Sequence, residues 1–252
     1  MKAVSDILLD TIKELQQLPS LTGSVLGGGT NLAIRYGHRQ SYDIDLFFPG
    51  IIGKNGFEAI LKEAKETFKE GIFGVDYPCN IDDQFIFQRF YIRKGDISIK
   101  VEILQNMQTN DEPDIIAGIR LMSERDIGLL KLMTASNRAN DKDIYDLDYL
   151  TDNLPLGLLM EQLKEKEDQY HEDVHRTIFD LDNELSPVEN ADLLLKFEAP
   201  GTHNNSRPGH SNPRRDIVEG SKNWLSARSG WRRKVRAYFR SIGKDFPEVS
   251  AQ

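Results

Sequence analysis

The sequence predicts an α+β fold in which a mixed sheet with flanking helices is followed by a helical subdomain and a basic tail. Segments with strand and helix patterns alternate up to about residue 104, whereas apolar residues recur only at helical spacing after Leu121. The 252 residues suffice for one large domain or for a core domain with an attachment. We therefore expect a sheet-containing part at 1–110, a helical part at 111–200, and a linker with a basic tail that can be flexible at 201–252.

Composition places the chain among ordinary globular proteins and excludes several classes. Hydrophobic residues make up 39% and charged residues 29% of the sequence. No window approaches the roughly 18 apolar residues of a membrane-spanning helix, and acids at Asp6, Asp10 and Glu14 are atypical of a signal peptide, so we expect a cytoplasmic protein. Cys79 is the only cysteine, which excludes an internal disulfide and a cysteine-based zinc site.

The elements of the first part follow from residue patterns. Residues 5–18 carry apolar side chains at helical spacing and are followed by Pro19, which stops a helix. Residues 96–104 alternate between apolar and polar side chains, so that Lys100 and Glu102 share the polar face of a strand. The remaining elements predicted here are strands at 22–26, 42–48 and 84–93 and helices at 31–36 and 57–69.

The second part is predicted to be helical. Ser123 and Asp126 match the two ends of a capping box, so a helix should begin there and run to about Arg138. The polar, Gly- and Pro-rich segment 201–215 is typical of a linker, and residues 224–240 form either a basic amphipathic helix or a solvated tail. Further helices are expected near 142–150, 156–169 and 172–179.

Charge is distributed unevenly between the tail and the rest of the chain. Residues 201–252 hold 11 Lys and Arg against 4 Asp and Glu, while residues 1–200 hold 21 Lys and Arg against 36 Asp and Glu. An acidic body with a basic tail is a division of charge that can favour contact with nucleic acid.

Three consecutive glycines lie between a predicted strand and a predicted helix. Such a turn, here Gly27–Gly29, leaves backbone N–H groups free at the helix start, where they and the helix dipole can bind phosphate. Glycines also occur in loops for conformational reasons, and for the turn alone that alternative stays open. The P-loop motif is absent, and a dinucleotide-binding motif is disfavoured because its third glycine would fall at Leu32.

Two aspartates lie two residues apart on a predicted strand. The side chains of Asp43 and Asp45 therefore point to one face. Adjacent carboxylates repel each other unless a cation lies between them, and Mg²⁺ prefers such oxygen ligands. A site of this kind can align the oxygens of a phosphoryl transfer. For the pair alone, the alternative is an edge strand with two solvated acids.

Glycine turn, helix and aspartate strand together resemble the nucleotidyltransferase superfamily of DNA polymerase β-like enzymes. The stretch GGTNLAIRYGHRQSYDIDLF is more specific and resembles the first motif of the AbiEii/AbiGii-type nucleotidyltransferase toxins. The match continues in GIRLMSERDIGLLKLMTASNRANDKDIYDL at 118–147 and covers roughly residues 20–185, with no resemblance seen after Pro200. It implies a nucleotidyltransferase-like fold with the catalytic half at 1–110.

Charged residues of the second matching block share helical faces. Lys131 and Arg138 are two helical turns apart, with small residues between them that leave room for a ligand. Asp143 and Asp146 are at i and i+3. For Lys131 and Arg138 the alternative is a solvated charged face. The resemblance implies that a Lys and an Asp of this block are needed for activity.

The resemblance also implies a cleft that holds a nucleoside triphosphate with Mg²⁺ or Mn²⁺. Glu102 would be the third acid of the metal site, although relatives more often carry Asp there, and an exposed Glu on a two-faced sheet is the alternative. The implied residues are, for catalysis, Asp43, Asp45, Lys131, Asp143 and Asp146; for the nucleotide, Gly28, Gly29, Thr30, Arg39, Ser41, Lys131 and Arg138; and for the metal, Asp43, Asp45 and Glu102.

The implied activity is metal-dependent transfer of a nucleoside monophosphate to an RNA acceptor, with the 3′ end of transfer RNA as the best-known target. The resemblance further implies a toxin of a bacterial toxin–antitoxin system, with a cognate antitoxin as partner and no membrane partner. The basic tail is a candidate for RNA contact. Two alternatives stay open, namely transfer to a small molecule such as an antibiotic and a non-catalytic nucleotide-binding relative.

Overall fold

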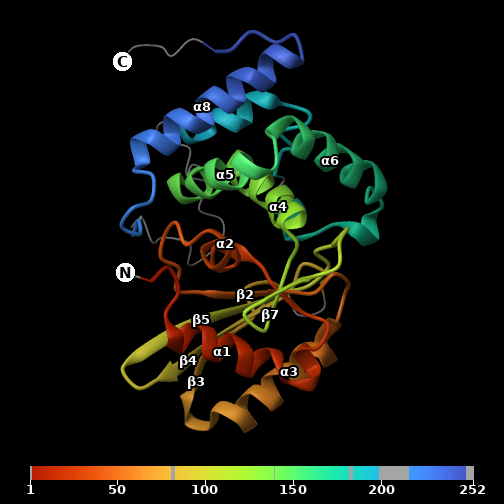
Figure 1. Ribbon diagram of the computed structural model, residues 1–252. Helices are drawn as coiled ribbons and strands as arrows, with labels where there is room; N and C mark the ends of the chain where they lie inside the picture. The colour runs from red at the N-terminus through yellow and green to blue at the C-terminus, as the bar shows by residue number, and fades with distance from the viewer. Residues whose placement is uncertain (1, 81–82, 139, 182–183, 199–215, 248–252) are drawn as a thin grey trace.

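A seven-stranded mixed sheet forms one half of the molecule, and a group of helices forms the other (Figure 1). The computed structural model describes residues 2–80, 83–138, 140–181, 184–198 and 216–247. The sheet half contains, with η marking 3₁₀ helices, α1 (Asp6–Gln16), η1 (Pro19–Leu21), β1 (Val25–Leu26), α2 (Gly28–Tyr36), β2 (Ile44–Phe47), α3 (Gly53–Phe68), η2 (Lys69–Gly71), β3 (Ile72–Asp76), β4 (Phe87–Lys94), β5 (Ile97–Leu104), β6 (Asp114–Ile116) and β7 (Ile119–Leu121). The helical half contains α4 (Glu124–Asn137), α5 (Asp141–Asn153), α6 (Leu156–Gln169), η3 (Asp173–His175), α7 (Ile178–Leu181), η4 (Ala191–Glu198) and α8 (Trp224–Ser241). None of the described helices is long and apolar enough to cross a lipid bilayer.

The strand that carries Asp45 lies in the middle of the sheet. The strands run in the order β3-β4-β5-β2-β1-β7-β6, and β2 pairs with β1 in antiparallel and with β5 in parallel orientation. The register sets Asp45 directly beside Glu102 on β5. Because β2 has a neighbouring strand on each side, the edge-strand alternative does not hold for Asp45. Asp43 was predicted on the same strand but lies just before β2, with an exposed side chain.

The two faces of the sheet differ as the alternation in β5 predicts. Ile99, Val101 and Ile103 are buried in a core that they share with residues of α1 and α3. The opposite face carries Lys100 and Glu102 and is turned toward the helical half (Figure 1). The apolar face thus anchors the sheet, which leaves the polar face to form the floor of a site.

Two helix ends near that floor differ from the prediction. α2 begins at Gly28, whereas the pattern predicted a start at Asn31, so two glycines form its first turn. α4 ends at Asn137, and Arg138 follows it with extended backbone as the C-cap. Arg138 therefore does not share a helical face with Lys131, although both side chains are close to the same space, as described below.

The helix expected at 172–179 is replaced by η3 and the short α7. Side-chain amides from the sheet half bind the backbone carbonyls that a helix would use internally. Asn106 Nδ2 donates to the carbonyls of Val174 and Arg176, and Gln108 Nε2 donates to that of His175, at 2.8–2.9 Å. The segment is thereby tied to the sheet half and cannot continue as a regular helix.

The sheet continues beyond the boundary predicted at residue 110. β7 pairs in parallel with β1 through Leu26 and Leu121, and β6 pairs with β7 at the edge of the sheet. The first residues of the segment 111–200 therefore belong to the sheet, and the helical half begins with α4.

The C-terminal helix is part of the core. Trp231, Val235 and Phe239 of α8 are fully buried in the same cluster as apolar residues of α4, α5 and α6. Gly230 allows close contact with α5, because a Cβ atom there would lie 2.4 Å from Oδ1 of Asp148. The solvated-tail alternative for residues 224–240 is therefore wrong. The predicted linker 201–215 lies outside the described residues.

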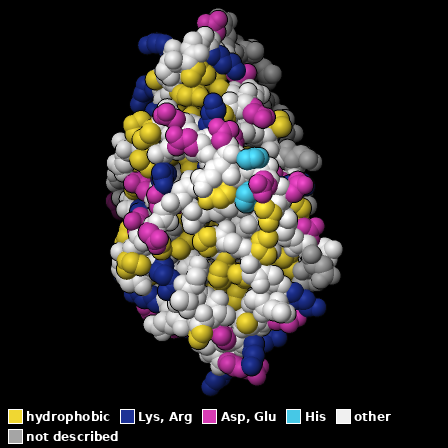
Figure 2. Space-filling view, turned by 90° about the vertical axis from the view of Figure 1, so that its right-hand side faces the viewer, with side chains coloured by type: hydrophobic (Ala, Val, Ile, Leu, Met, Phe, Trp, Pro, Cys, Tyr) yellow, Lys and Arg dark blue, Asp and Glu magenta, His cyan; other side chains and the backbone are white. Residues whose placement is uncertain are grey.

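Basic residues of the C-terminal segment are neutralised by acids of the body. Lys222 and Lys234 both bind the buried carboxylate of Asp148, at 2.7 and 3.0 Å. Arg228 and Arg232 both contact Glu198. On the face shown in Figure 2, acidic and basic side chains lie interspersed. Part of the positive charge of this segment is thus used inside the fold, while Arg233, Arg236 and Arg240 of α8 are exposed.

Candidate active site between the two halves

A cavity of about 240 Å³ lies between the polar face of the sheet and the helical half. Most of the residues predicted for the site line it, although they come from segments far apart in the sequence. These lining residues are Gly28, Gly29, Arg39, Ser41, Asp43, Asp45, Glu102, Lys131, Arg138 and Asp143. Thr30 and Asp146 are the two that do not.

The glycines at the start of α2 are required by close packing. Gly28 has φ +60°, and a Cβ atom there would lie 1.9 Å from Oδ2 of Asp45. A Cβ atom at Gly29 would lie 2.2 Å from Nη2 of Arg39. A carboxylate and a guanidinium therefore rest against the first turn of the helix, which explains both glycines by geometry and still leaves their backbone facing the cavity.

Asp45 carries excess negative charge in a confined place. Burial, together with the neighbouring charges of Glu102 and Asp43, raises the pKa of Asp45 to about 7. Lys100 opposes this shift, and its ammonium lies 3.5 Å from Asp43 and 3.2 Å from Glu102. Lys100, together with Arg89 on Glu102, leaves one of the three acids without a counter-charge, so this corner of the cavity favours an added cation.

Glu102 differs from the two aspartates because it already has its own counter-charge. It is 4% exposed and pairs with Arg89 at 2.6 Å. Within the described ranges, no group of three or more His, Cys, Asp or Glu side chains is arranged to hold one metal ion. Asp43 and Asp45 fit a Mg²⁺ ion that takes its remaining ligands from water and substrate phosphate, which is the way Mg²⁺ is usually held.

Asp146 is a buried hub that positions three other side chains. Its carboxylate accepts hydrogen bonds from Arg39 at 2.6 and 2.7 Å, lies 2.7 Å from Nε2 of His38, and is 2.9 Å from the ammonium of Lys131. Burial alone would raise the pKa of Asp146, but Arg39 and Lys131 outweigh it and hold the pKa well below its ordinary range. Predicted as a catalytic residue, Asp146 instead lies behind the cavity wall with no exposed surface.

Lys131 and Asp143 form the wall opposite the aspartates. The Lys131 ammonium is 2.8 Å from Oδ1 of Asp143, and the two acids of α5 raise the lysine's pKa although burial acts to lower it. Oδ2 of Asp143 is buried without a hydrogen-bond partner in the described structure. Arg138 lines the same wall and forms no ion pair with any described residue, so its guanidinium can bind an anion.

Thr30, which was predicted to contact phosphate, is instead buried and supports the neighbouring backbone. It is 1% exposed, and its hydroxyl lies 2.5 Å from the carbonyl of Asp43 and 2.8 Å from the hydroxyl of Ser41. Thr30 therefore fixes the backbone from which the Asp43 side chain projects.

A second segment holds the loop that carries Arg39. Residues 216–222, which we call the C-terminal strap, run beside residues 38–42. Arg39 and Ile217 form an antiparallel bridge. Gln40 N donates to the carbonyl of Asp216 at 2.7 Å, and Val218 N donates to that of His38 at 3.1 Å. The strap thus supplies main-chain hydrogen-bond partners to His38 and Gln40 on either side of Arg39.

Several lining residues were missed by sequence reasoning. Lys100 shares the polar face of β5 with Glu102, so the strand alternation could have identified it. Lys142 lies beside Asp143, and burial lowers its pKa. The apolar wall comes from scattered residues that carry no shared pattern, namely Phe47, Phe87, Leu104, Met107, Ile127, Leu130, Ile178 and Phe179.

The arrangement as a whole is a nucleotidyltransferase fold. The structure is similar to that of MenT4, the nucleotidyltransferase toxin Rv2826c from Mycobacterium tuberculosis H37Rv, with a TM-score of 0.55 and 18% sequence identity over 94% of this chain and 83% of that chain. The model of the family described as "Nucleotidyl transferase AbiEii toxin, Type IV TA system" matches residues 8–244. The chain therefore belongs to the AbiEii nucleotidyltransferase toxin family.

The family match confirms the resemblance seen in the two motifs and extends it. It continues into α8, whereas the motifs gave no resemblance after Pro200. An uncharacterised protein of Aquifex aeolicus (strain VF5) is 31% identical over 126 residues, which cover 50% of this chain and 56% of that protein. The chain thus spans about half the length of this curated relative.

Proposed function

We propose that the protein is a toxin that transfers a nucleoside monophosphate from a nucleoside triphosphate to the 3′ hydroxyl of an RNA, with transfer RNA as the acceptor and a cognate antitoxin as its neutralising partner. The observation that carries the proposal is the opposition of two walls across one cavity. Asp43 and Asp45 lie on one wall beside the start of α2, and Lys131 and Arg138 lie on the other. The proposal places this reaction in the cytoplasm.

The chemistry follows from what each wall can bind. The acceptor oxygen attacks the α-phosphorus, the bond to the β-phosphate breaks, pyrophosphate leaves, and the hydroxyl proton passes to a base or to solvent. Arg138 and Lys142 would bind the triphosphate, and their positive charge would offset the charge that develops on the departing pyrophosphate. The free Oδ2 of Asp143 would accept a hydrogen bond from a substrate hydroxyl.

A divalent ion held by Asp43 and Asp45 would supply a positive charge that aligns the acceptor hydroxyl and the α-phosphate. The excess negative charge at Asp45 supports this assignment, since it needs a cation. Glu102 would act mainly through Lys100 and Arg89, which it holds in place at 3.2 and 2.6 Å. Arg39 would present the edge of its guanidinium to the cavity while Asp146 fixes it.

The test is transfer of label from each nucleoside triphosphate to total RNA in the presence of Mg²⁺. The wild-type protein should label RNA, Asp43→Asn should abolish labelling, and the remote exposed change Asp6→Asn should leave it intact. Growth arrest on expression, without any drug, separates an RNA acceptor from an antibiotic-like acceptor. Absence of transfer under conditions in which a known transferase labels the same RNA would count against the proposal.

A further inference from the structure

β4 carries a row of large side chains from the cavity onto an open part of the sheet. Phe87 lines the cavity, Arg89 pairs with Glu102, and Tyr91 and Arg93 follow at alternate positions along the strand. Alternate residues of a strand share one face. The row therefore lies on the same face as the carboxylates and leads away from them toward the hairpin between β4 and β5.

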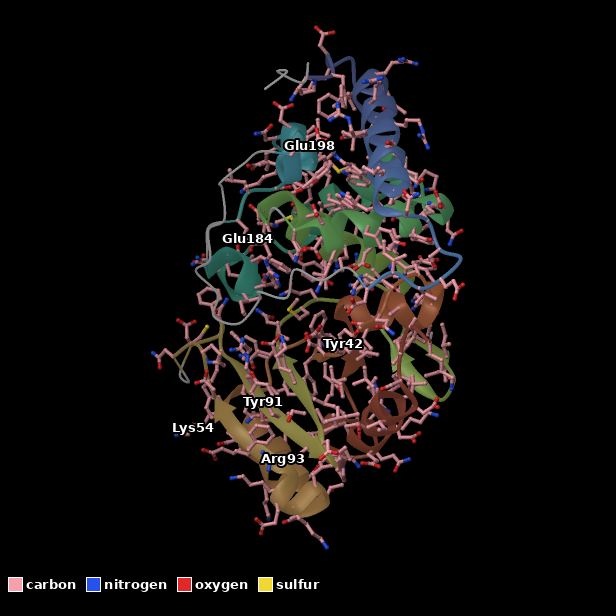
Figure 3. The ribbon with its side chains drawn as sticks, turned by 90° about the vertical axis from the view of Figure 1, so that its left-hand side faces the viewer. Tyr42, Lys54, Tyr91, Arg93, Glu184 and Glu198 are labelled. Atoms are coloured by element: carbon pink, nitrogen blue, oxygen red, sulfur yellow. The ribbon has the colours of Figure 1, made fainter. Side chains whose placement is uncertain are left out.

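Three side chains of this region form what we call the aromatic platform, namely Phe73, Tyr91 and Arg93. The rings of Phe73 and Tyr91 are stacked with centroids 5.4 Å apart and 24° between their planes. The Arg93 guanidinium lies 4.8 Å from the centroid of the Phe73 ring. Gly74 has φ +60°, and a Cβ atom there would lie 2.9 Å from the Tyr91 ring, so a glycine leaves room for that ring. Figure 3 shows Tyr91 and Arg93 on β4, away from the helical half.

The platform is open and carries unbalanced positive charge. Tyr91 and Phe73 are half-buried, and Arg93 is exposed. Arg89 is neutralised by Glu102, but Arg93 has no ion pair with any residue in the described part of the chain. Its guanidinium can therefore stack on a ring and bind a phosphate at the same time.

The platform is close to the reacting groups. Tyr91 lies opposite Lys100 in the β4–β5 register, and Lys100 reaches both Asp43 and Glu102. Neighbouring strands are about 4.8 Å apart, so the Tyr91 backbone lies roughly 10 Å across the sheet from β2. A polynucleotide whose terminal hydroxyl lies at the carboxylates has to leave the cavity somewhere, and this open face adjoins the site.

We propose that the aromatic platform binds the last unpaired nucleotides of the RNA acceptor, with a base stacked on Tyr91, whose ring is supported by Phe73, and a backbone phosphate bound by Arg93. The inference rests on the proposed transfer to RNA and adds where the acceptor strand lies. Stacked aromatic rings beside an unpaired arginine are what single-stranded nucleic acid requires, because every base has a face that can stack. Stacking on the platform makes recognition tolerant of sequence at these nucleotides.

The test combines direct binding with kinetics. Fluorescence anisotropy measures the affinity of the full chain for a short single-stranded RNA without nucleoside triphosphate, and transfer assays give KM for RNA and for the triphosphate separately. Loss of one stacked base should weaken RNA binding by roughly fivefold to a hundredfold in Tyr91→Ala. KM for RNA should rise by a similar factor, while KM for the triphosphate should not change. Tyr91→Trp, which keeps a stacking ring, should retain binding.

A matched pair of variants distinguishes a specific role of Arg93 from general electrostatic attraction of RNA. Arg93→Ala and Arg233→Ala each remove one exposed arginine, and Arg233 lies on α8 with no ion pair among the described residues. Arg93→Ala should weaken RNA binding and Arg233→Ala should not. Equal losses in both would show unspecific attraction and overturn the proposal, as would unchanged RNA affinity in Tyr91→Ala.

The two proposals fail in different ways. Normal transfer to RNA with an unchanged KM for RNA in Tyr91→Ala and Arg93→Ala would overturn the platform and leave the transferase activity standing. RNA binding that depends on Tyr91, in a wild-type protein that transfers nothing to RNA, would support the platform as an RNA site and overturn the proposed reaction.

Discussion

Removal of the Asp146 carboxylate is the most severe test of how the site is held together. Asp146→Ala leaves the buried guanidinium of Arg39 without a counter-ion, while Lys131 keeps only Asp143. Breaking a buried pair by removing one partner costs about 3–5 kcal/mol. The total free energy of unfolding of a domain is about 5–15 kcal/mol, so this loss is a large share of it.

The assay is urea-induced unfolding followed by far-UV circular dichroism. Asp146→Asn keeps the shape of the side chain and one acceptor oxygen, so it should lose less than Asp146→Ala. Asp6→Ala removes an exposed pair with Lys2, in which both side chains are at least 70% exposed, and should cause no measurable change. A loss below about 1 kcal/mol for Asp146→Ala would refute the reasoning, since it would mean that water solvates the buried cations.

The pH dependence of the free energy of unfolding tests the same buried ion pairs independently. The folded-state pKa of Asp146 is depressed, so its contribution is fully present above the unfolded-state pKa of about 3.9 and is lost as pH falls through the lower folded-state value. The difference in stability between wild type and Asp146→Asn should be constant from neutral pH to about pH 5 and should shrink only in stronger acid.

Three further predictions concern single features of the structure. The pKa of Asp45 is raised to about 7, so in metal-free protein the stability of wild type relative to Asp45→Asn should fall as pH rises from about 4 to about 7. Melting curves of both proteins in the presence of a chelator measure this difference. Gly28→Ala should disrupt the site and abolish activity because of the contact with Asp45, whereas Gly157→Ala, with nothing within 4 Å of an added Cβ, should leave activity unchanged. Trp231→Ala should lower the free energy of unfolding by about 3–5 kcal/mol; a loss typical of a surface residue would mean that α8 is not part of the core.

The fold class and the strands nearest the site could be predicted from local patterns. The alternation in β5 correctly gave the buried face of Ile99 and Ile103 and the polar face of Glu102, because strand periodicity depends only on neighbouring residues. The two short strands β6 and β7 escaped notice, since three residues do not establish a period. Their place beside β1 is a long-range property.

Only part of the candidate site could be predicted, because some of its contacts also depend on segments far apart in the sequence. Motif spacing indicated the residues that line the cavity, but it gave no means of distinguishing Asp143, which faces the cavity, from Asp146, which lies behind it. Both are on one face of α5, and the difference arises from Arg39 and His38 on a distant loop. The role of Thr30 likewise depends on the path of the backbone at Asp43.

The C-terminal strap has a consequence for the order in which the site is completed. Its side-chain contact from Tyr42 to Asp216 joins residues 174 positions apart in the chain. Contacts of such separation incur loop-closure entropy before they contribute stability, and they form late in folding. The loop that presents Arg39 should thus gain protection from hydrogen exchange after the sheet beneath it, and a refolding molecule should bind nucleotide only in its last kinetic phase.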